Sequence, residues 1–178
     1  MTDPILLFDP ERTTNALAIA GAGALGYLDG HVLDLTVGPE AGFWTKWQPD
    51  RLTTNDLDPA VPADHHHDAR ATPFPDRSFD SGVWDPPYGY RGTSRLASDR
   101  RYGLAGAYRT PDQIDALLLY GTLELLRLVR HFALVKCMNQ RVNGKPRRQR
   151  DWLISEAEKT GASYVDELHR TGNQYGQH

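Results

Sequence analysis

A tetrapeptide of unusual chemistry, Asp85-Pro86-Pro87-Tyr88, directly follows a short apolar run that ends at Trp84. Two successive prolines fix φ and remove two N–H donors, so the stretch offers almost only hydrogen-bond acceptors. The Asp85 carboxylate and the Pro86 carbonyl can accept both hydrogens of one amino group, which orients the nitrogen lone pair towards an electrophile. The Tyr88 ring offers a flat face for a base extruded from its helix. The alternative is a Pro-Pro turn with an ordinary Asp and a core Tyr.

Further candidate residues follow the other short apolar segments of the chain. The first group is Asp34-Leu35-Thr36-Val37-Gly38, with another glycine at Gly42. Glycines at such positions let the backbone approach a ligand closely. Asp56 follows the next segment, where a carboxylate can accept hydrogen bonds from a ribose diol, and Asp68-Ala69 comes later. In open parallel sheets ligands bind at the carboxyl ends of the strands, so these positions are candidate ligand contacts.

The elements that must position these residues alternate between strands and helices. Short apolar runs predict strands over residues 31–36, 52–54, 79–84 and 132–138, with a last strand over 163–168. Helices are predicted over 14–27, from Pro111 to about Arg130, and over 150–160, where Gly161 ends the helix. This alternation indicates an α/β fold with a mostly parallel sheet.

Taken together, these residues resemble the class I S-adenosylmethionine-dependent amino-methyltransferases, the group that contains DNA adenine-N6 and cytosine-N4 methylases. Asp85 to Tyr88 matches their catalytic Asp-Pro-Pro-Tyr, and Asp34 to Gly42 resembles their cofactor loop. Asp56 resembles their ribose-binding acid, and Asp68 the residue near the cofactor's adenine. Residues 135–140, Val-Lys-Cys-Met-Asn-Gln, are similar to small phage and actinobacterial members. The resemblance spans roughly residues 31–170.

The resemblance implies one Rossmann-like domain over residues 1–178, with a sheet flanked by helices and a lead-in and helix over 1–30. Only residues 43–50 separate the cofactor loop from the second strand, so we expect the family's first helix to be shortened or absent. We also expect an incomplete last strand and no separate target-recognition domain. The implied cofactor is S-adenosylmethionine, and its predicted contacts are Asp34, Thr36, Gly38, Gly42, Asp56, Asp68 and Ala69.

The predicted reaction is methyl transfer to an exocyclic amino nitrogen of a nucleic-acid base. Adenine N6 in DNA is favoured, because Asp in the first motif position resembles adenine-N6 methylases more often than cytosine-N4 ones. Related sites also act on RNA guanine or adenine amino groups and on protein glutamine, so these substrates stay open. An alternative of another class is a non-catalytic nucleic-acid-binding protein that keeps the fold.

Basic residues concentrate in two segments that follow predicted strands. Residues 89–110 carry a net charge of +4 and residues 141–150 carry +5, although the whole chain has a formal charge of −3. A positive rim around an amino-binding pocket suits a phosphate backbone. We predict nucleic-acid contacts from Arg91, Arg95, Arg100, Arg101, Lys145, Arg147, Arg148 and Arg150.

Other features narrow the class of protein. The single cysteine, Cys137, excludes an internal disulfide framework and suits a reducing cytosol. No apolar run approaches the 18 or so residues of a membrane span, and we expect a cytoplasmic protein without a membrane partner. Three adjacent histidines, at 65–67, favour an exposed loop over a metal site. The glycines at 21, 23 and 26 match a dinucleotide fingerprint, but no following helix fits, so they favour small-residue packing.

Overall fold

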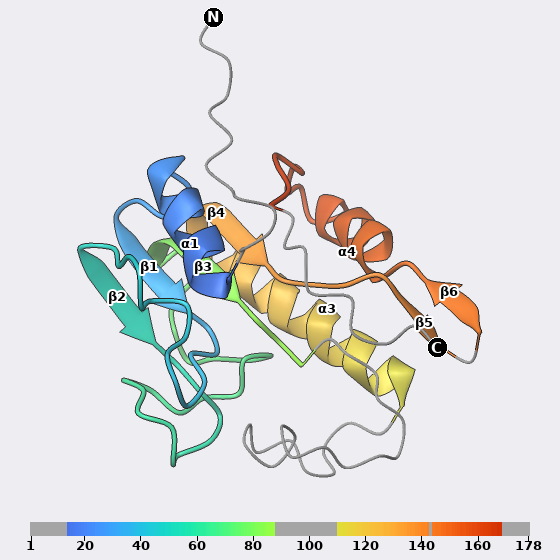
Figure 1. Cartoon of the computed structure of the whole chain (residues 1–178), viewed down its shortest axis with the longest axis horizontal. Coiled ribbons are helices and arrows are strands. Elements are labelled where there is room, and N and C mark those ends of the chain that lie inside the picture. Colours follow the sequence, from blue (N-terminus) through green and yellow to red (C-terminus); the bar gives the residue numbers. More distant parts are fainter. Residues whose placement is uncertain (1–13, 88–109, 143, 169–178) are drawn as a thin grey trace, which may run out of the picture.

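The computed structural model describes residues 14–87, 110–142 and 144–168 (Figure 1). Its centre is a four-stranded sheet of β1 (His31–Asp34), β2 (Arg51–Thr54), β3 (Phe79–Trp84) and β4 (Val129–Val135). The strand order is β2-β1-β3-β4 and all three pairings are parallel. The chain adds β2 on one side of β1 and then β3 and β4 on the other. The carboxyl ends of β1 and β3 therefore meet at the point where an open α/β sheet binds ligands.

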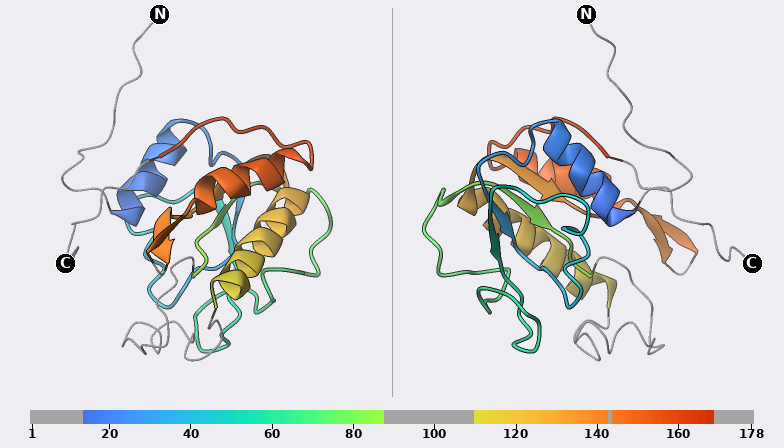
Figure 2. Two further views of the ribbon diagram at one scale, coloured as in Figure 1. Left: turned by 90° about the vertical axis from the view of Figure 1, so that its right-hand side faces the viewer. Right: turned by 60° about the vertical axis from the view of Figure 1, so that its left-hand side comes forward.

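Three helices cover the two faces of the sheet: α1 (Asn15–Ala24), α3 (Pro111–Leu128) and α4 (Gln149–Glu158). Figure 2 shows α1 on one face and α3 with α4 on the other. Alternate strand residues supply the two cores, because successive side chains of a strand point to opposite faces. Leu33 and Trp84 pack with the leucines of α3, whereas Val32 and Val83 pack with α1. The predicted α/β fold with a parallel sheet flanked by helices is confirmed.

The longest helix, α3, begins where the sequence predicts. Thr110 forms a capping box with Gln113, and Pro111 occupies the first helical position, where its missing N–H costs nothing. Leu118, Leu125 and Leu128 are fully buried. Each such side chain contributes about 1.5–3 kcal/mol on burial, so α3 anchors one face of the sheet.

Two expectations about the connections have different outcomes. Residues 39–50, between β1 and β2, form turns without a helix, as the short spacing predicts. The predicted last strand over 163–168 is wrong, because this segment pairs with no strand in the described part of the chain. Its Val165 is exposed, and Asp166 accepts a hydrogen bond from the Tyr27 hydroxyl at 2.8 Å. The segment thus attaches through side chains instead of through a backbone ladder.

The basic segment after β4 forms an antiparallel hairpin of β5 (Gln140–Val142) and β6 (Lys145–Arg147), which the sequence analysis did not predict. The Asn-Gly pair at 143–144 is a hairpin turn signal, and Gly144 has a φ of +76°, which only glycine adopts at little cost. Among the described residues, no helix is long and apolar enough to cross a membrane.

Candidate cofactor and amino-group site

Four predicted or newly recognised polar residues lie at one edge of the sheet. Asp34 ends β1, Asp56 follows β2, Asp85 follows β3, and Lys136 follows β4. All four strands are parallel neighbours, so their carboxyl ends share this edge. These four residues, although distant in sequence, are thereby gathered into one cluster at the switch between β1 and β3.

The Asp34 carboxyl group is buried, with 1% of the residue exposed. The Trp44 indole N–H donates to its Oδ2 at 2.6 Å, and the Thr36 backbone N–H donates to Oδ1 at 3.1 Å. Burial raises the pKa of Asp34 to about 7, the two hydrogen bonds oppose that rise, and the nearby Asp85 and Asp56 carboxylates add to it. Asp34 is close enough to both acids to sense their charge, and a bound cation would favour its ionised form.

Gly38 and Asp56 join the loops that follow β1 and β2. The Gly38 N–H donates to Asp56 Oδ2 at 2.9 Å, and the Asp58 N–H donates to Oδ1 at 3.0 Å. Gly38 has a φ of +68°, which explains a glycine here. Each carboxylate oxygen has about two lone pairs, so the half-buried Asp56 keeps acceptor capacity for hydroxyl groups. At Gly42 the structure gives no steric reason for a glycine, because an added Cβ would meet nothing within 4 Å.

Asp85 is held from two sides. The Lys136 ammonium lies 2.9 Å from Asp85 Oδ2, and the Thr36 hydroxyl donates to the Asp85 carbonyl at 3.3 Å. Lys136 also lies 5.7 Å from the centre of the Phe43 ring, so it spans the cofactor loop and the tetrapeptide. Pro86 is buried and Pro87 half-buried, whereas Tyr88 lies outside the described residues.

Asn55 connects the site to the chain beyond β2, and sequence reasoning missed it. The buried Asn55 amide donates to the carbonyls of Leu35 and His67 at 3.1 and 3.0 Å and accepts the His67 N–H at 2.9 Å. Trp44 and Lys136 were also missed as site residues. Trp44 packs in the core, being 4% exposed. Its ten-residue separation from Asp34 gave no signal of their hydrogen bond.

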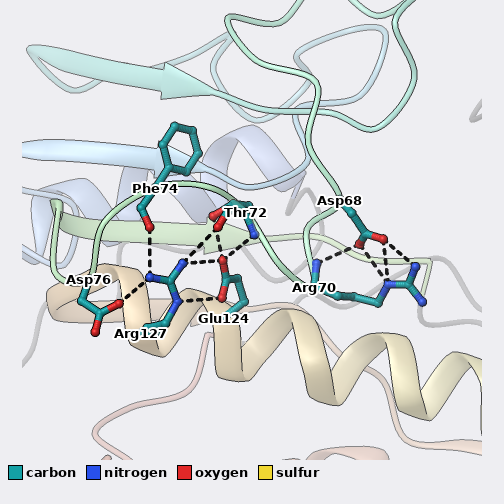
Figure 3. Close-up of polar contacts among 7 residues, drawn as sticks. All are labelled: Asp68, Arg70, Thr72, Phe74, Asp76, Glu124 and Arg127. Carbon is teal, nitrogen blue, oxygen red and sulfur yellow. Dashed lines mark hydrogen bonds and ion pairs between the residues drawn. The ribbon is translucent and has the colours of Figure 1, made fainter.

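Asp68 has a local partner (Figure 3). Both of its oxygens accept hydrogen bonds from the Arg70 guanidinium, which lower the pKa of Asp68 against the opposing effect of burial. Its neighbour Ala69 packs in the core with the α3 leucines. The role of Asp68 at the cofactor's adenine stays a prediction, and in the structure its carboxylate closes a turn.

A buried ion pair holds the segment that leads into β3 (Figure 3). Glu124 of α3 is 7% exposed and accepts hydrogen bonds from the N–H and hydroxyl of Thr72, both at 2.7 Å. Arg127 donates to Glu124, to the carbonyl of Phe74 and to Asp76. This network fixes residues 72–76 on α3 and so sets where β3 begins.

Of the two segments predicted to contact nucleic acid, the structure describes the predicted contact residues of only the second. Arg91, Arg95, Arg100 and Arg101 lie outside the described residues. In the second segment, Arg147 forms ion pairs with Asp112 and Asp115 of α3, and Arg150 pairs with Asp151 and Glu167. Lys145 and Arg148 are exposed, and neither has an acidic partner among the described residues. Two of the five cations of residues 141–150 are therefore paired with carboxylates among the described residues.

The remaining sequence features have structural contacts. His65 and His67 stack at 5.5 Å and pack edge-on against Phe74. Across the described part of the chain, no group of three His, Cys, Asp or Glu residues is arranged to hold a metal ion. Gly23 lies in α1, where an added Cβ would come within 2.6 Å of the Trp47 ring, so the prediction of small-residue packing is confirmed at this position. Gly26 instead follows the helix with a φ of +79°.

In comparisons with known proteins, no protein-family model matches the chain, and no curated protein matches it. The motif and the geometry of the site are therefore the basis for assigning a function.

Proposed function

We propose that the protein transfers a methyl group from S-adenosylmethionine to an exocyclic amino nitrogen of a nucleic-acid base, with adenine N6 in DNA as the favoured target. The observation that carries this proposal is the meeting of Asp34, Asp56 and Asp85 at the carboxyl ends of three adjacent strands. This edge combines a cluster of acidic side chains with the acceptor-rich Asp-Pro-Pro segment.

The residues present fit the proposed cofactor in charge and hydrogen bonding. Even where Asp34 holds a proton, the Asp56 and Asp85 carboxylates outnumber the Lys136 ammonium, and this excess of negative charge favours a ligand that carries a sulfonium and an ammonium group. Asp56 retains acceptor capacity for a ribose diol, and Gly38 keeps the chain in a turn beside it. When bound, S-adenosylmethionine supplies an activated methyl group for direct displacement by the target nitrogen.

The chain's own contribution is positioning. Asp85 accepts an N–H of the target amino group, and the Pro86 carbonyl is the second predicted acceptor. Thr36 and Lys136 hold Asp85 through the carbonyl and carboxylate contacts at 3.3 and 2.9 Å. Alignment of reactants of this kind lowers a barrier by roughly 7–11 kcal/mol, so a fixed Asp85 is the main requirement of the proposal.

Transfer from radiolabelled S-adenosylmethionine to duplex DNA, single-stranded RNA and a glutamine-containing peptide tests the proposal. We expect label in DNA with the wild-type chain and none with Asp85→Ala. The exposed acid before β2, in Asp50→Asn, provides a control that keeps the label. Transfer to RNA or to the peptide alone would redirect the substrate assignment, and transfer to none of the three would reject the reaction.

One observation favours the non-catalytic alternative. The connection between β1 and β2 lacks a helix, so turns stand beside the proposed cofactor site where the resembled family has its first helix. A nucleic-acid-binding protein without cofactor affinity would show DNA binding and no calorimetric response to S-adenosylmethionine, and that pair of results would replace the enzymatic proposal.

A further inference from the structure

The cations of residues 141–150 are of two kinds. Arg147 and Arg150 are half-buried and each pairs with two carboxylates. Arg141, Lys145 and Arg148 are exposed and have no acidic partner among the described residues. Four carboxylates thus neutralise two of the five cations, and the other three keep their charge facing solvent.

We propose that these three residues, the hairpin cations Arg141, Lys145 and Arg148, form a docking surface for the phosphodiester backbone of DNA. This inference rests on the proposed function and deepens it, since it separates docking cations from structural ones among residues that sequence alone treats alike. The Arg141 guanidinium donates to the Gly144 carbonyl at 2.8 Å, which directs it along the turn of the hairpin. Figure 1 shows β5 and β6 projecting from the body of the fold beyond α3 and α4.

The structural cations hold this hairpin in a defined place. Arg147 ties β6 to the first turns of α3 through Asp112 and Asp115. Gln149, 1% exposed, donates to Asp115 Oδ1 at 3.2 Å and accepts the Met138 N–H at 3.3 Å. The chain is therefore fixed both before β5 and after β6. A rigid, charged projection loses little conformational entropy on binding, which suits a docking element.

The distance from the candidate site fits a bound strand. The hairpin begins four residues after Lys136, which contacts Asp85. Four residues span at most about 13–14 Å when fully extended. Successive phosphates along one strand of duplex DNA rise by about 3.4 Å, so the first residue of the hairpin lies within the rise of about four nucleotides from Lys136.

The surface is hollowed beside Arg148. The hollow has a volume of about 310 Å³, and its lining includes Pro146, Arg148 and Trp152. Asp115 also lines it, but the Arg147 ion pair balances that carboxylate. The hollow is shallow and open to solvent, and its lining is both polar and apolar, so it adds accessible surface beside Arg148 and is not an enclosed site.

The test is fluorescence anisotropy with a labelled 20-base-pair DNA duplex and the full chain, from about 50 to 200 mM salt. The test variant carries Arg141→Gln, Lys145→Gln and Arg148→Gln. The matched control carries Arg51→Gln, Arg77→Gln and Arg130→Gln, an equal charge change at the opposite edge of the sheet, where β2, β3 and β4 begin. Circular dichroism establishes that both fold.

We expect the test variant to bind DNA at least about ten-fold more weakly at 100 mM salt, with a log–log salt slope flatter by about 2–3. The control should stay within about two-fold of wild type. Equal losses in the two variants would mean that only net charge matters and would overturn the inference. The same titration with an RNA duplex and a competition with polyglutamate test the assignment to DNA. If the test variant loses binding only in one of these two experiments and keeps its affinity for the DNA duplex, the assignment to DNA is overturned.

The methyl-transfer assay separates this inference from the proposed function. If the wild type methylates DNA while the test variant binds DNA as the wild type does, the docking surface is wrong and the reaction stands. If the test variant alone loses DNA binding while the wild type transfers no methyl group, the surface stands and the reaction is wrong.

Discussion

The Lys136 ammonium lies 2.9 Å from Asp85 Oδ2, which links the end of β4 to the tetrapeptide after β3. The two side chains are 26% and 23% exposed, so the pair is mostly shielded from water. Lys136 also faces Phe43 of the loop after β1, and one cation thereby connects three of the segments that form the candidate site.

A double-mutant cycle measures this pair. Lys136→Met should lower the free energy of unfolding by about 1–3 kcal/mol, because Asp85 loses a hydrogen-bonded cation in a shielded site. Asp85→Asn should recover part of that loss in the Lys136→Met background, with a coupling energy of about 1 kcal/mol. Urea denaturation gives the free energy of unfolding of the wild type, the two single variants and the double variant. Additive effects would show that the contact does not contribute to stability.

The buried carboxyl of Asp34 predicts an unusual dependence of stability on pH. Its folded pKa is about 7, whereas the ordinary value is 3.8. Between these values the folded chain holds a proton that the unfolded chain has released, so the free energy of unfolding falls as pH rises from about 4 to 7. At about 1.4 kcal/mol per pKa unit, the full fall is on the order of 4 kcal/mol.

Asp34→Asn tests this dependence. The amide does not ionise, so its pH profile should be flatter than that of wild type between pH 5 and 7. It should also be less stable at pH 5 by about 1–3 kcal/mol, because an NH₂ group then faces the Trp44 or Thr36 donor. Asp50→Asn, at an exposed acid before β2, is the control. A wild-type profile in Asp34→Asn would assign the dependence to other groups.

The fold was more predictable than the contacts between its elements. The bounds of β3 and the start of α3 agree with the sequence analysis, because apolar runs and the Thr110 cap are local signals. Arg147 was predicted to touch nucleic acid, yet its partners Asp112 and Asp115 lie 35 and 32 residues away. Pairings over such separations depend on how α3 and β6 pack, which hydrophobic periodicity does not encode.

Asp56 is predicted to determine cofactor affinity. Asp56→Asn removes a charged acceptor for the ribose hydroxyls, and binding of S-adenosylmethionine should weaken by about ten- to a hundred-fold, or 1.5–3 kcal/mol. Isothermal titration calorimetry gives the dissociation constants. Asp58→Asn alters the next acid in the same loop and should change affinity less than two-fold. Equal affinities in wild type and Asp56→Asn would place the cofactor elsewhere.

Two arginines near the end of α3 provide a matched test of burial. Arg127 pairs with Glu124, which is 7% exposed, whereas Arg130 pairs with the more exposed Asp80. Arg127→Met leaves a buried carboxylate without its cation and should destabilise the fold by about 2–4 kcal/mol. Arg130→Met should cost less than about 1 kcal/mol. Thermal unfolding of the two variants compares them, and similar losses would refute the burial argument.

The central claim is methyl transfer to an amino nitrogen held at Asp85. It is tested most directly by incubating the chain with duplex DNA and S-adenosylmethionine that carries a deuterated methyl group, followed by nucleoside mass spectrometry. We predict N6-methyldeoxyadenosine with the deuterated mass for wild type, and none for Asp85→Ala, whose cofactor binding by calorimetry should stay within a few-fold of wild type. Labelled nucleoside formed equally by Asp85→Ala, or none formed by a wild-type chain that binds both cofactor and DNA, would contradict the account.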